Sequence, residues 1–303
     1  MVVMAHGSQG VSAGPDAGSS TPSRPFGPPR DELGIGQTLR DHGIPTLKYL
    51  MKTEVHTYAF SVAANAILSF FPGIVLILTL TRKVFHSQAM YDVVLQLLRD
   101  YLPSNQDFVI KNLKIMASVH NVQIFSLVML VISSTGIFLP LEVALNKVWG
   151  FKSNRSYIGN QLISLGLAIG CGFLALISIG ATAANLHFLG KFEMDNILFR
   201  AVGYLIMKVF AIFASIAIFY VIYWLLPNGK VPARAVLPAA MITGILFEVA
   251  KQLYVLSLPY LDFQQVYGPF SVSVTLMFWA YVSGMLLLGG AFLSAASHAK
   301  QGS

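Results

Sequence analysis

The chain has 303 residues, of which 55% belong to the hydrophobic set AVILMFWYC and only 11% are charged. Average soluble proteins carry about 25% charged residues, so this composition excludes a soluble globular enzyme and a disordered chain. The formal net charge is +7, which in a membrane protein indicates basic flanks that face the cytoplasm and anionic lipid. Because no run combines dense Lys and Arg with aromatic stacking residues, we expect no nucleic-acid partner.

The first 34 residues are rich in Gly, Pro and Ser and contain no apolar stretch typical of a signal peptide. Such a segment buries too little apolar surface to offset the entropy lost on ordering. Residues 1–34 are therefore predicted to form a disordered cytoplasmic tail, and residues 35–298 a transmembrane domain. Its first part, residues 35–56, has the pattern of an amphipathic lead-in to the first span.

Six stretches are long and apolar enough to cross about 30 Å of hydrocarbon as helices. They are continuous apolar runs without the alternation of barrel strands. The predicted spans are residues 57–81, 121–141, 161–184, 201–226, 235–257 and 269–297. The sequence thus predicts an all-α integral membrane protein with six transmembrane helices.

The Lys and Arg residues outside the spans are distributed unevenly between the two sides of the membrane. With the N-terminus inside, eleven of them face the cytoplasm and seven face the outer side. Cytoplasmic loops carry the excess of basic residues in membrane proteins, so both termini are predicted to be cytoplasmic.

The connection 82–120 carries two short apolar stripes with helical spacing, separated by Pro103. The first stripe consists of Val94, Leu97, Leu98, Tyr101 and Leu102, and the second of Val109, Leu113 and Met116. We predict two amphipathic helices in this first outer loop. They either lie on the outer face of the membrane or form a small cap packed on the bundle.

Ser61, Asn65 and Ser69 are spaced i, i+4, i+8 in the first span and share one helical face. Two interpretations are open. These side chains form hydrogen bonds that hold helices together, or they line the polar wall of a cavity.

Two ionisable residues, Glu248 and Lys251, share a face of the fifth span. Charges at this depth cost at least about 2.5–3.5 kcal/mol each unless they are paired or hydrated. Counted from the span ends at about 1.5 Å per residue, Lys208 of the fourth span lies at the depth of Glu248. We therefore predict that Glu248 pairs with Lys208, with Lys251, or with both, as a structural pair or as a transport or binding site.

The end of the second span carries Glu142 and Asn146, spaced i, i+4, followed by Trp149 at a position typical of an interfacial anchor. Gly166 and Gly170 form a GxxxG pair in the third span. Such pairs allow close helix packing, either within the bundle or between two copies of the chain.

No motif supports catalysis. The seven histidines include no HxH or HExxH arrangement, and the chain lacks a GxSxG sequence and a P-loop. Cys171 is the only cysteine, so neither an intramolecular disulfide nor a thiolate metal cluster is possible. We expect a non-enzymatic protein with no cofactor and no metal.

Three segments resemble the YihY/BrkB family of membrane proteins, and the resemblance covers about residues 45–298. They are Ser-Phe-Phe-Pro in the first span, PLEVALNKVWGFKSNRSY after the second, and the run from GILFEVAKQLY to GGAFLSAA through spans five and six. The resemblance implies a bacterial inner-membrane protein with six helices and cytoplasmic termini. Part of this family was formerly labelled ribonuclease BN, and some members are connected with export of envelope lipid.

The leading expectation is a protein that transports a lipid or amphiphile, or assists its export, with membrane lipid and envelope lipid-export proteins as candidate partners. The alternative is an envelope scaffold or assembly partner that transports nothing, and a ribonuclease is a remote third. The candidate cavity residues are Ser61, Asn65, Ser69, Glu142, Asn146, Lys208, Glu248, Lys251, Tyr254, Tyr267 and Trp279.

Overall fold

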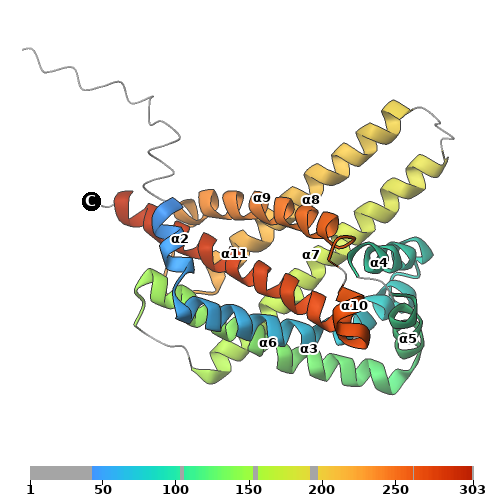
Figure 1. Ribbon diagram of the computed structural model, residues 1–303, viewed down its shortest axis with the longest axis horizontal. Helices are drawn as coiled ribbons and strands as arrows, with labels where there is room; N and C mark the ends of the chain where they lie inside the picture. Colours follow the sequence, from blue (N-terminus) through green and yellow to red (C-terminus); the bar gives the residue numbers. More distant parts are fainter. Residues whose placement is uncertain (1–42, 103–105, 153–155, 192–196, 262, 302–303) are drawn as a thin grey trace, which may run out of the picture.

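The computed structural model describes residues 43–102, 106–152, 156–191, 197–261 and 263–301, and this part of the chain contains helices and no strand (Figure 1). The predicted all-α fold is therefore confirmed. The predicted disordered tail, residues 1–34, lies outside the described residues, as does the first part of the predicted lead-in.

Six helices are long and apolar enough to cross a membrane, as predicted. They are α3 (Thr53–Lys83), α6 (His120–Trp149), α7 (Tyr157–Lys191), α8 (Ile197–Leu225), α9 (Ala233–Ser257) and α11 (Ser271–Gln301). Each predicted span falls within its helix to within two residues.

Helix α6 extends eight residues beyond the predicted span and carries Glu142 and Asn146 with it. It ends at Gly150, whose φ of 71° is left-handed. The Gly150 N–H donates to the Lys147 carbonyl and the Phe151 N–H to the Asn146 carbonyl, which is a Schellman motif. The apolar run marks where hydrocarbon surrounds the helix, whereas this glycine terminates it.

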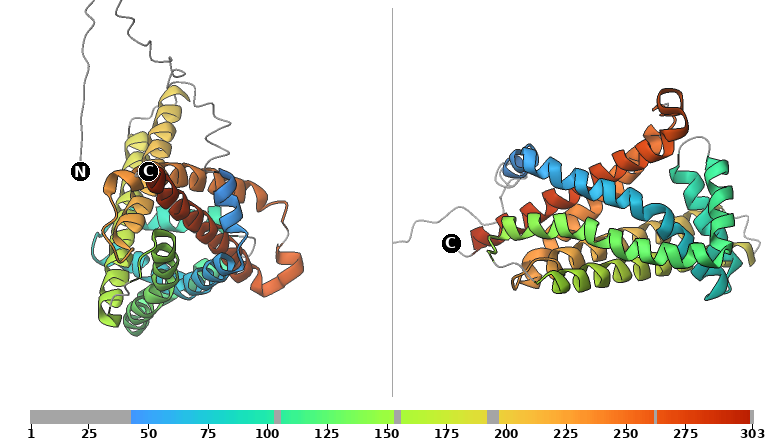
Figure 2. Two further views of the ribbon diagram at one scale, coloured as in Figure 1. Left: turned by 90° about the vertical axis from the view of Figure 1, so that its left-hand side faces the viewer. Right: turned by 90° about the horizontal axis from the view of Figure 1, so that it is seen from below.

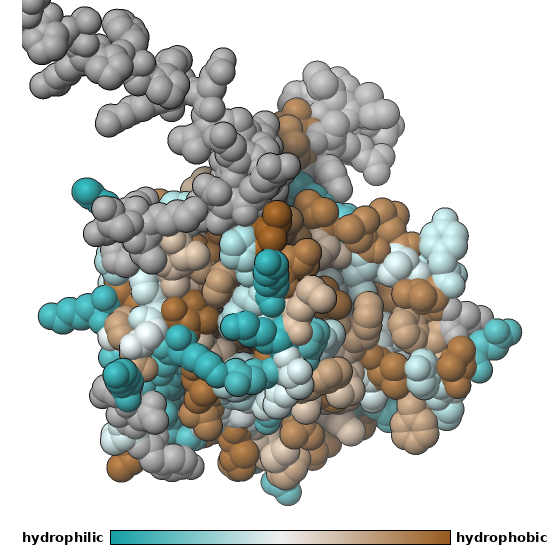
Figure 3. Space-filling model, turned by 60° about the vertical axis from the view of Figure 1, so that its left-hand side comes forward, coloured by the Kyte–Doolittle hydropathy of each residue, from teal (hydrophilic) through white to brown (hydrophobic). Residues whose placement is uncertain are grey.

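The six long helices close a ring. Contacts run from α3 to α6, α7, α8, α9 and α11 in turn, and α11 packs back against α3. The end-on view of Figure 2 shows this arrangement, and apolar side chains cover much of the face shown in Figure 3. A helix that is apolar on all sides is typical of a membrane span.

Two short helices, α4 (Gln88–Tyr101) and α5 (Gln106–Ser118), stand across one end of the ring (Figure 2). Val94, Leu98 and Leu113 of their apolar stripes are buried in a cluster that includes Val75 and Leu78 of α3, whereas Leu97 and Met116 are exposed. Of the two predicted arrangements the structure therefore has the packed cap, and we call this the capped end. Ser87 precedes α4 and accepts a hydrogen bond from the Met90 N–H at 3.3 Å, as an N-cap residue does.

The other end, the uncapped end, carries α2 (Ile44–Leu50), which packs against α11. The chain turns at Met51 and Lys52 before α3 begins, so the described part of the lead-in is a separate short helix. The short α10 (Phe263–Tyr267) and the 3₁₀ turn Gly268–Phe270 connect α9 to α11 at the capped end (Figure 1).

Helices approach one another closely where glycine removes a side chain. A Cβ on Gly244 of α9 would lie 2.6 Å from the side chain and 3.0 Å from the backbone of Ile216 in α8. In contrast, a Cβ on Gly166 or Gly170 would meet no described atom within 4 Å. The GxxxG pair therefore makes no close packing with the described part of this chain.

Candidate functional site

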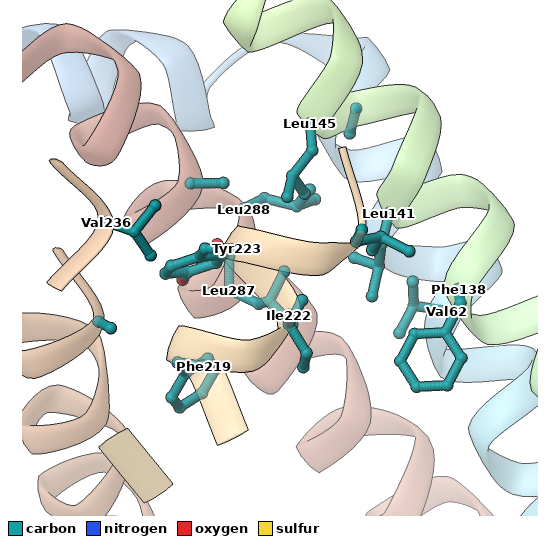
Figure 4. Packing of buried hydrophobic residues seen from close by; sticks show 14 of the residues in the cluster. Val62, Phe138, Leu141, Leu145, Phe219, Ile222, Tyr223, Val236, Leu287 and Leu288 are labelled. Atoms are coloured by element: carbon teal, nitrogen blue, oxygen red, sulfur yellow. The ribbon is translucent and has the colours of Figure 1, made fainter. Parts of the chain in front are cut away.

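An apolar cavity of about 450 Å³ lies among the long helices, and we call it the central cavity. Side chains from α3, α6, α8, α9 and α11 line it, including Val62, Phe138, Phe219, Phe247 and Trp279. Figure 4 shows several of these helices turning side chains toward one another, with Phe219 and Ile222 of α8 opposite Phe138 of α6.

The lining of the central cavity offers almost no hydrogen-bonding capacity. Among its described residues Ser283 carries the one hydroxyl, and this hydroxyl donates to the Trp279 carbonyl of its own helix at 2.8 Å. A buried water needs two to four polar partners. The cavity is therefore chemically suited to hydrocarbon.

A second apolar cavity of about 300 Å³ lies under the cap, and we call it the cap cavity. It is lined by α4 together with side chains of α3, α7, α9 and α11. Phe70, Leu276 and Trp279 line both cavities, so these three side chains form a partition between two chambers.

Aromatic rings hold the partition in place. The Trp279 ring centroid lies 5.5 Å from that of Phe247 and 4.8 Å from that of Tyr254. The Tyr254 hydroxyl donates to the Tyr101 carbonyl at 3.2 Å. Since Tyr101 is the last residue of α4, this hydrogen bond connects the partition to the cap.

Of the eleven predicted site residues, Trp279 lines both cavities and Tyr254 lines the cap cavity. The exposed Tyr267 lies in α10 at the capped end, where its ring stacks on Phe263 with centroids 6.3 Å apart. It is therefore separate from the two chambers.

The polar face of α3 meets α6 at Asn65. A Cβ added to Gly136 of α6 would lie 1.9 Å from the Asn65 side-chain oxygen, so the Asn65 amide fills the space that this glycine leaves. The Asn65 amide nitrogen donates to the Ser61 carbonyl at 2.9 Å, and the Ser69 hydroxyl donates to the Ala66 carbonyl at 3.0 Å. Both hydrogen bonds remain within α3, so they do not join helices, and the three side chains are absent from the lining of the two chambers as described.

Glu248 is buried and pairs with Lys251, as one branch of the prediction had it. The Lys251 Nζ lies 2.7 Å from Glu248 Oε1 and 2.6 Å from Oε2. On the α8 side the partner is Ser215, whose hydroxyl donates to Oε1 at 2.6 Å.

The predicted pairing of Glu248 with Lys208 is not found among the described residues. Lys208 lies seven residues from Ser215 on α8, about 10 Å along the helix axis at 1.5 Å per residue, and no ion pair of Lys208 is found among the described residues. The close approach of Gly244 to Ile216 fixes the register of these two helices. Counting residues from the ends of apolar runs does not detect this contact.

Glu142 and Asn146 tie α6 to its neighbours at the uncapped end. With its amide nitrogen turned toward Glu142, Asn160 of α7 donates to both carboxylate oxygens at 2.9 and 3.1 Å. The Asn146 side-chain oxygen accepts from the Asn228 backbone N–H at 2.8 Å. Both side chains are buried, and both lie outside the lining of the two chambers as described.

A smaller pocket of about 230 Å³ at the uncapped end is lined by charged and aromatic side chains. Glu54 and Lys147 form an exposed ion pair there, and the Lys52 ammonium lies 6.0 Å from the centre of the Tyr49 ring. Burial of Tyr49, reinforced by Tyr58 and Glu54, raises the pKa of its phenol to about 12. Tyr49 therefore stays neutral at physiological pH.

Sequence reasoning missed most of the cavity lining, namely Phe70, Phe219, Phe247 and Leu276. One signal was available: Phe247 and Tyr254 are seven residues apart, so both rings project from one face of α9. In the described part of the chain no group of three His, Cys, Asp or Glu side chains is placed to hold a metal ion.

Comparison with known proteins gives matches among bacterial membrane proteins. The UPF0761 membrane protein of Pseudomonas paraeruginosa is 30% identical over 173 residues, which are 55% of this chain and 40% of the relative. That of Acinetobacter baylyi is 25% identical over 185 residues, 57% of this chain and 42% of the relative. The UPF0761 membrane protein of Yersinia pestis is 26% identical over 171 residues, 54% of each chain.

The matched regions therefore span about half the length of these curated relatives or less. No solved structure matches the chain. The model of the family described as Virulence factor BrkB matches residues 46–303, which include all six long helices and both chambers. The resemblance in the sequence motifs is thereby confirmed, and the chain belongs to the YihY/BrkB family of membrane proteins.

Proposed function

We propose that this protein transports a lipid or another amphiphile, or assists its export, in the bacterial inner membrane. The observation that carries the proposal is the apolar central cavity lined by five helices of the ring. An amphiphile would place its hydrocarbon tail in this cavity while its headgroup stays in a polar region.

The energetics of the cavity favour an occupant. Unfilled apolar volume costs free energy because the surrounding side chains lose contacts, and the central cavity offers about 450 Å³ of such volume. Water gains too few hydrogen bonds there to fill the space, whereas membrane hydrocarbon is the surrounding solvent.

We further propose that both termini face the cytoplasm. The excess of basic residues on that side supports this orientation, as does the packing of α2 against α11 at the uncapped end. Lys52 and Lys147 of the pocket at this end would then lie on the side where anionic headgroups attract basic groups.

A vesicle assay tests the proposal. The purified protein is reconstituted into vesicles that contain fluorescent phospholipid, and the fraction of probe that crosses the bilayer is measured with a membrane-impermeant quencher. The diagnostic variant is Ala66→Phe, because Ala66 lines the central cavity. The matched control is Ala64→Phe on the same helix, where the side chain is exposed on the outside of the bundle.

We expect translocation by the wild type and the Ala64→Phe control, and a loss of at least severalfold in Ala66→Phe. Equal rates in protein-containing and protein-free vesicles would contradict transport. The scaffold alternative would be favoured if cells that lack the protein have an envelope defect and expression of the Ala66→Phe variant fully corrects it.

A further inference from the structure

We infer that the two chambers bind a single hydrocarbon chain and that Trp279 determines the chain length they accept. The inference rests on the proposed function only in that a lipid tail enters the ring. It adds that the hydrocarbon chain is the part of the ligand that is recognised and that Trp279 limits its length.

The chambers lie end to end along the helices. On α3 the central cavity is lined from Val62 to Phe70 and the cap cavity from Phe70 to Ile77. At about 1.5 Å per residue these stretches are about 12 Å and about 10 Å long. The combined space is an elongated slot parallel to the spanning helices, which is the shape and direction of a lipid chain in a bilayer.

The length of the slot can be compared with one leaflet. The hydrocarbon core is about 30 Å thick, so the chains of one leaflet occupy about 15 Å. By the same rise per residue the central cavity extends about 12 Å along α3 and about 16 Å along α11, where it is lined from Leu276 to Leu287. The central cavity alone thus fits a chain of one leaflet, and only the two chambers together fit a longer one.

Trp279 is the residue that keeps the chambers apart. It is the largest of the three side chains that line both chambers, and it projects from the same face of α11 as Leu276, one turn away. Phe247 and Tyr254 hold its ring from the α9 side. Replacing the indole with a methyl group would join the chambers without touching the ion pair of α9.

The first experiment asks whether a chain occupies the cavity. In a Trp149→Phe, Trp224→Phe background only Trp279 fluoresces, and in a Trp149→Phe, Trp279→Phe background only Trp224 does. Trp224 is 45% exposed and reports the surrounding lipid, so it is the matched control. Both proteins are placed in bilayers of phosphatidylcholine with brominated chains, which quench indole fluorescence on contact.

We expect brominated chains to quench both tryptophans. Adding Ala66→Phe should relieve the quenching of Trp279 at least severalfold and leave that of Trp224 unchanged. Quenching of Trp224 alone, or an Ala66→Phe variant that changes neither signal, would overturn the inference.

The second experiment tests chain length. Wild type, Trp279→Phe and Trp279→Ala are purified from membranes that contain phospholipids of short, medium and long chains, and bound lipid is compared with bulk lipid by mass spectrometry. Bulk lipid and the cavity are equally apolar, so a longer chain gains only where it fills volume that would otherwise stay empty. We expect Trp279→Ala to enrich the longest chains severalfold relative to wild type, and Trp279→Phe to resemble wild type.

Leu276→Ala is the second variant, because it opens the same partition if Trp279→Ala fails to fold. If Trp279→Ala and Leu276→Ala both fold and bind lipids with the same chain-length distribution as wild type, the role of Trp279 in chain-length selection is refuted. These outcomes are independent of transport. A protein that selects chains but translocates no probe would contradict the proposed function and support the inference. Translocation without chain selection would support the proposed function and contradict the inference.

Discussion

Removing the Lys251 ammonium group, as in Lys251→Met, is expected to destabilise the bundle more than removing the charge of its partner. Glu248 has a side chain that is 6% exposed, against 21% for Lys251. Among the described residues, Lys251→Met therefore leaves the more deeply buried charge with the Ser215 hydroxyl as its one hydrogen-bond donor. Breaking a buried pair in this way costs about 3–5 kcal/mol.

Glu248→Gln should cost less, about 1–3 kcal/mol. The glutamine oxygen still accepts from Ser215, and the long Lys251 side chain can extend its ammonium group toward a polar region. The double variant Glu248→Gln, Lys251→Met carries no stranded charge. We expect it to lie within about 1 kcal/mol of wild type, because buried pairs replaced as a unit are often neutral.

The measurement is unfolding in mixed micelles of increasing SDS content, followed by helical circular dichroism, with all four proteins compared in one double-mutant cycle. A coupling energy of about 2 kcal/mol or more confirms that the two charges act as a pair. Additive losses would refute the argument. If the double variant is stable and translocates lipid normally, the pair is structural. A stable double variant that translocates nothing would instead assign these residues to the site.

Three further predictions follow from local contacts. Gly244→Ala should destabilise the protein by about 1–3 kcal/mol, because its Cβ would lie 3.0 Å from the backbone of α8. Gly166→Ala, whose Cβ meets no described atom within 4 Å, should be neutral or stabilising by up to about 1 kcal/mol. SDS unfolding compares the two variants, and equal losses of stability would contradict the reasoning. Tyr254→Phe removes the hydrogen bond to the last residue of α4, worth about 0.5–1.5 kcal/mol, so amide exchange in α4 should accelerate while that in α6 stays unchanged. Asn146→Ala leaves the Asn228 N–H without its side-chain acceptor and should cost about 1–3 kcal/mol; full stability of this variant in the same unfolding assay would show that water replaces the amide.

The six spans and their order could be predicted from the sequence because the bilayer imposes a length and a composition. Backbone groups in hydrocarbon must be satisfied within each segment, so about 20 apolar residues form a helix wherever they occur. The stripes on residues 82–120 likewise predict α4 and α5. Their packing as a cap required the structure, because an amphipathic helix buries the same face against lipid or against protein.

The candidate site was predicted less well, and the reason is physical. Asn65, Glu142 and Asn146 are polar residues in an apolar sequence, which suggests a binding site. A polar group in hydrocarbon must nevertheless form a hydrogen bond wherever it lies, so its presence does not by itself indicate a site. All three lie at contacts between helices rather than at the chambers. Of the predicted residues, Trp279 and Tyr254 are the two that line the chambers.

The sequence by itself determined that this protein is a six-helix membrane protein of the YihY/BrkB type with two ionisable residues, Glu248 and Lys251, in its fifth span. Only the tertiary structure decided which apolar side chains face inward. Phe213 and Phe219 both lie in α8, but Phe213 is 69% exposed and Phe219 is 6% exposed and lines the central cavity. Lipid and protein interior are equally apolar, so composition cannot distinguish the two positions, whereas closure of the ring does.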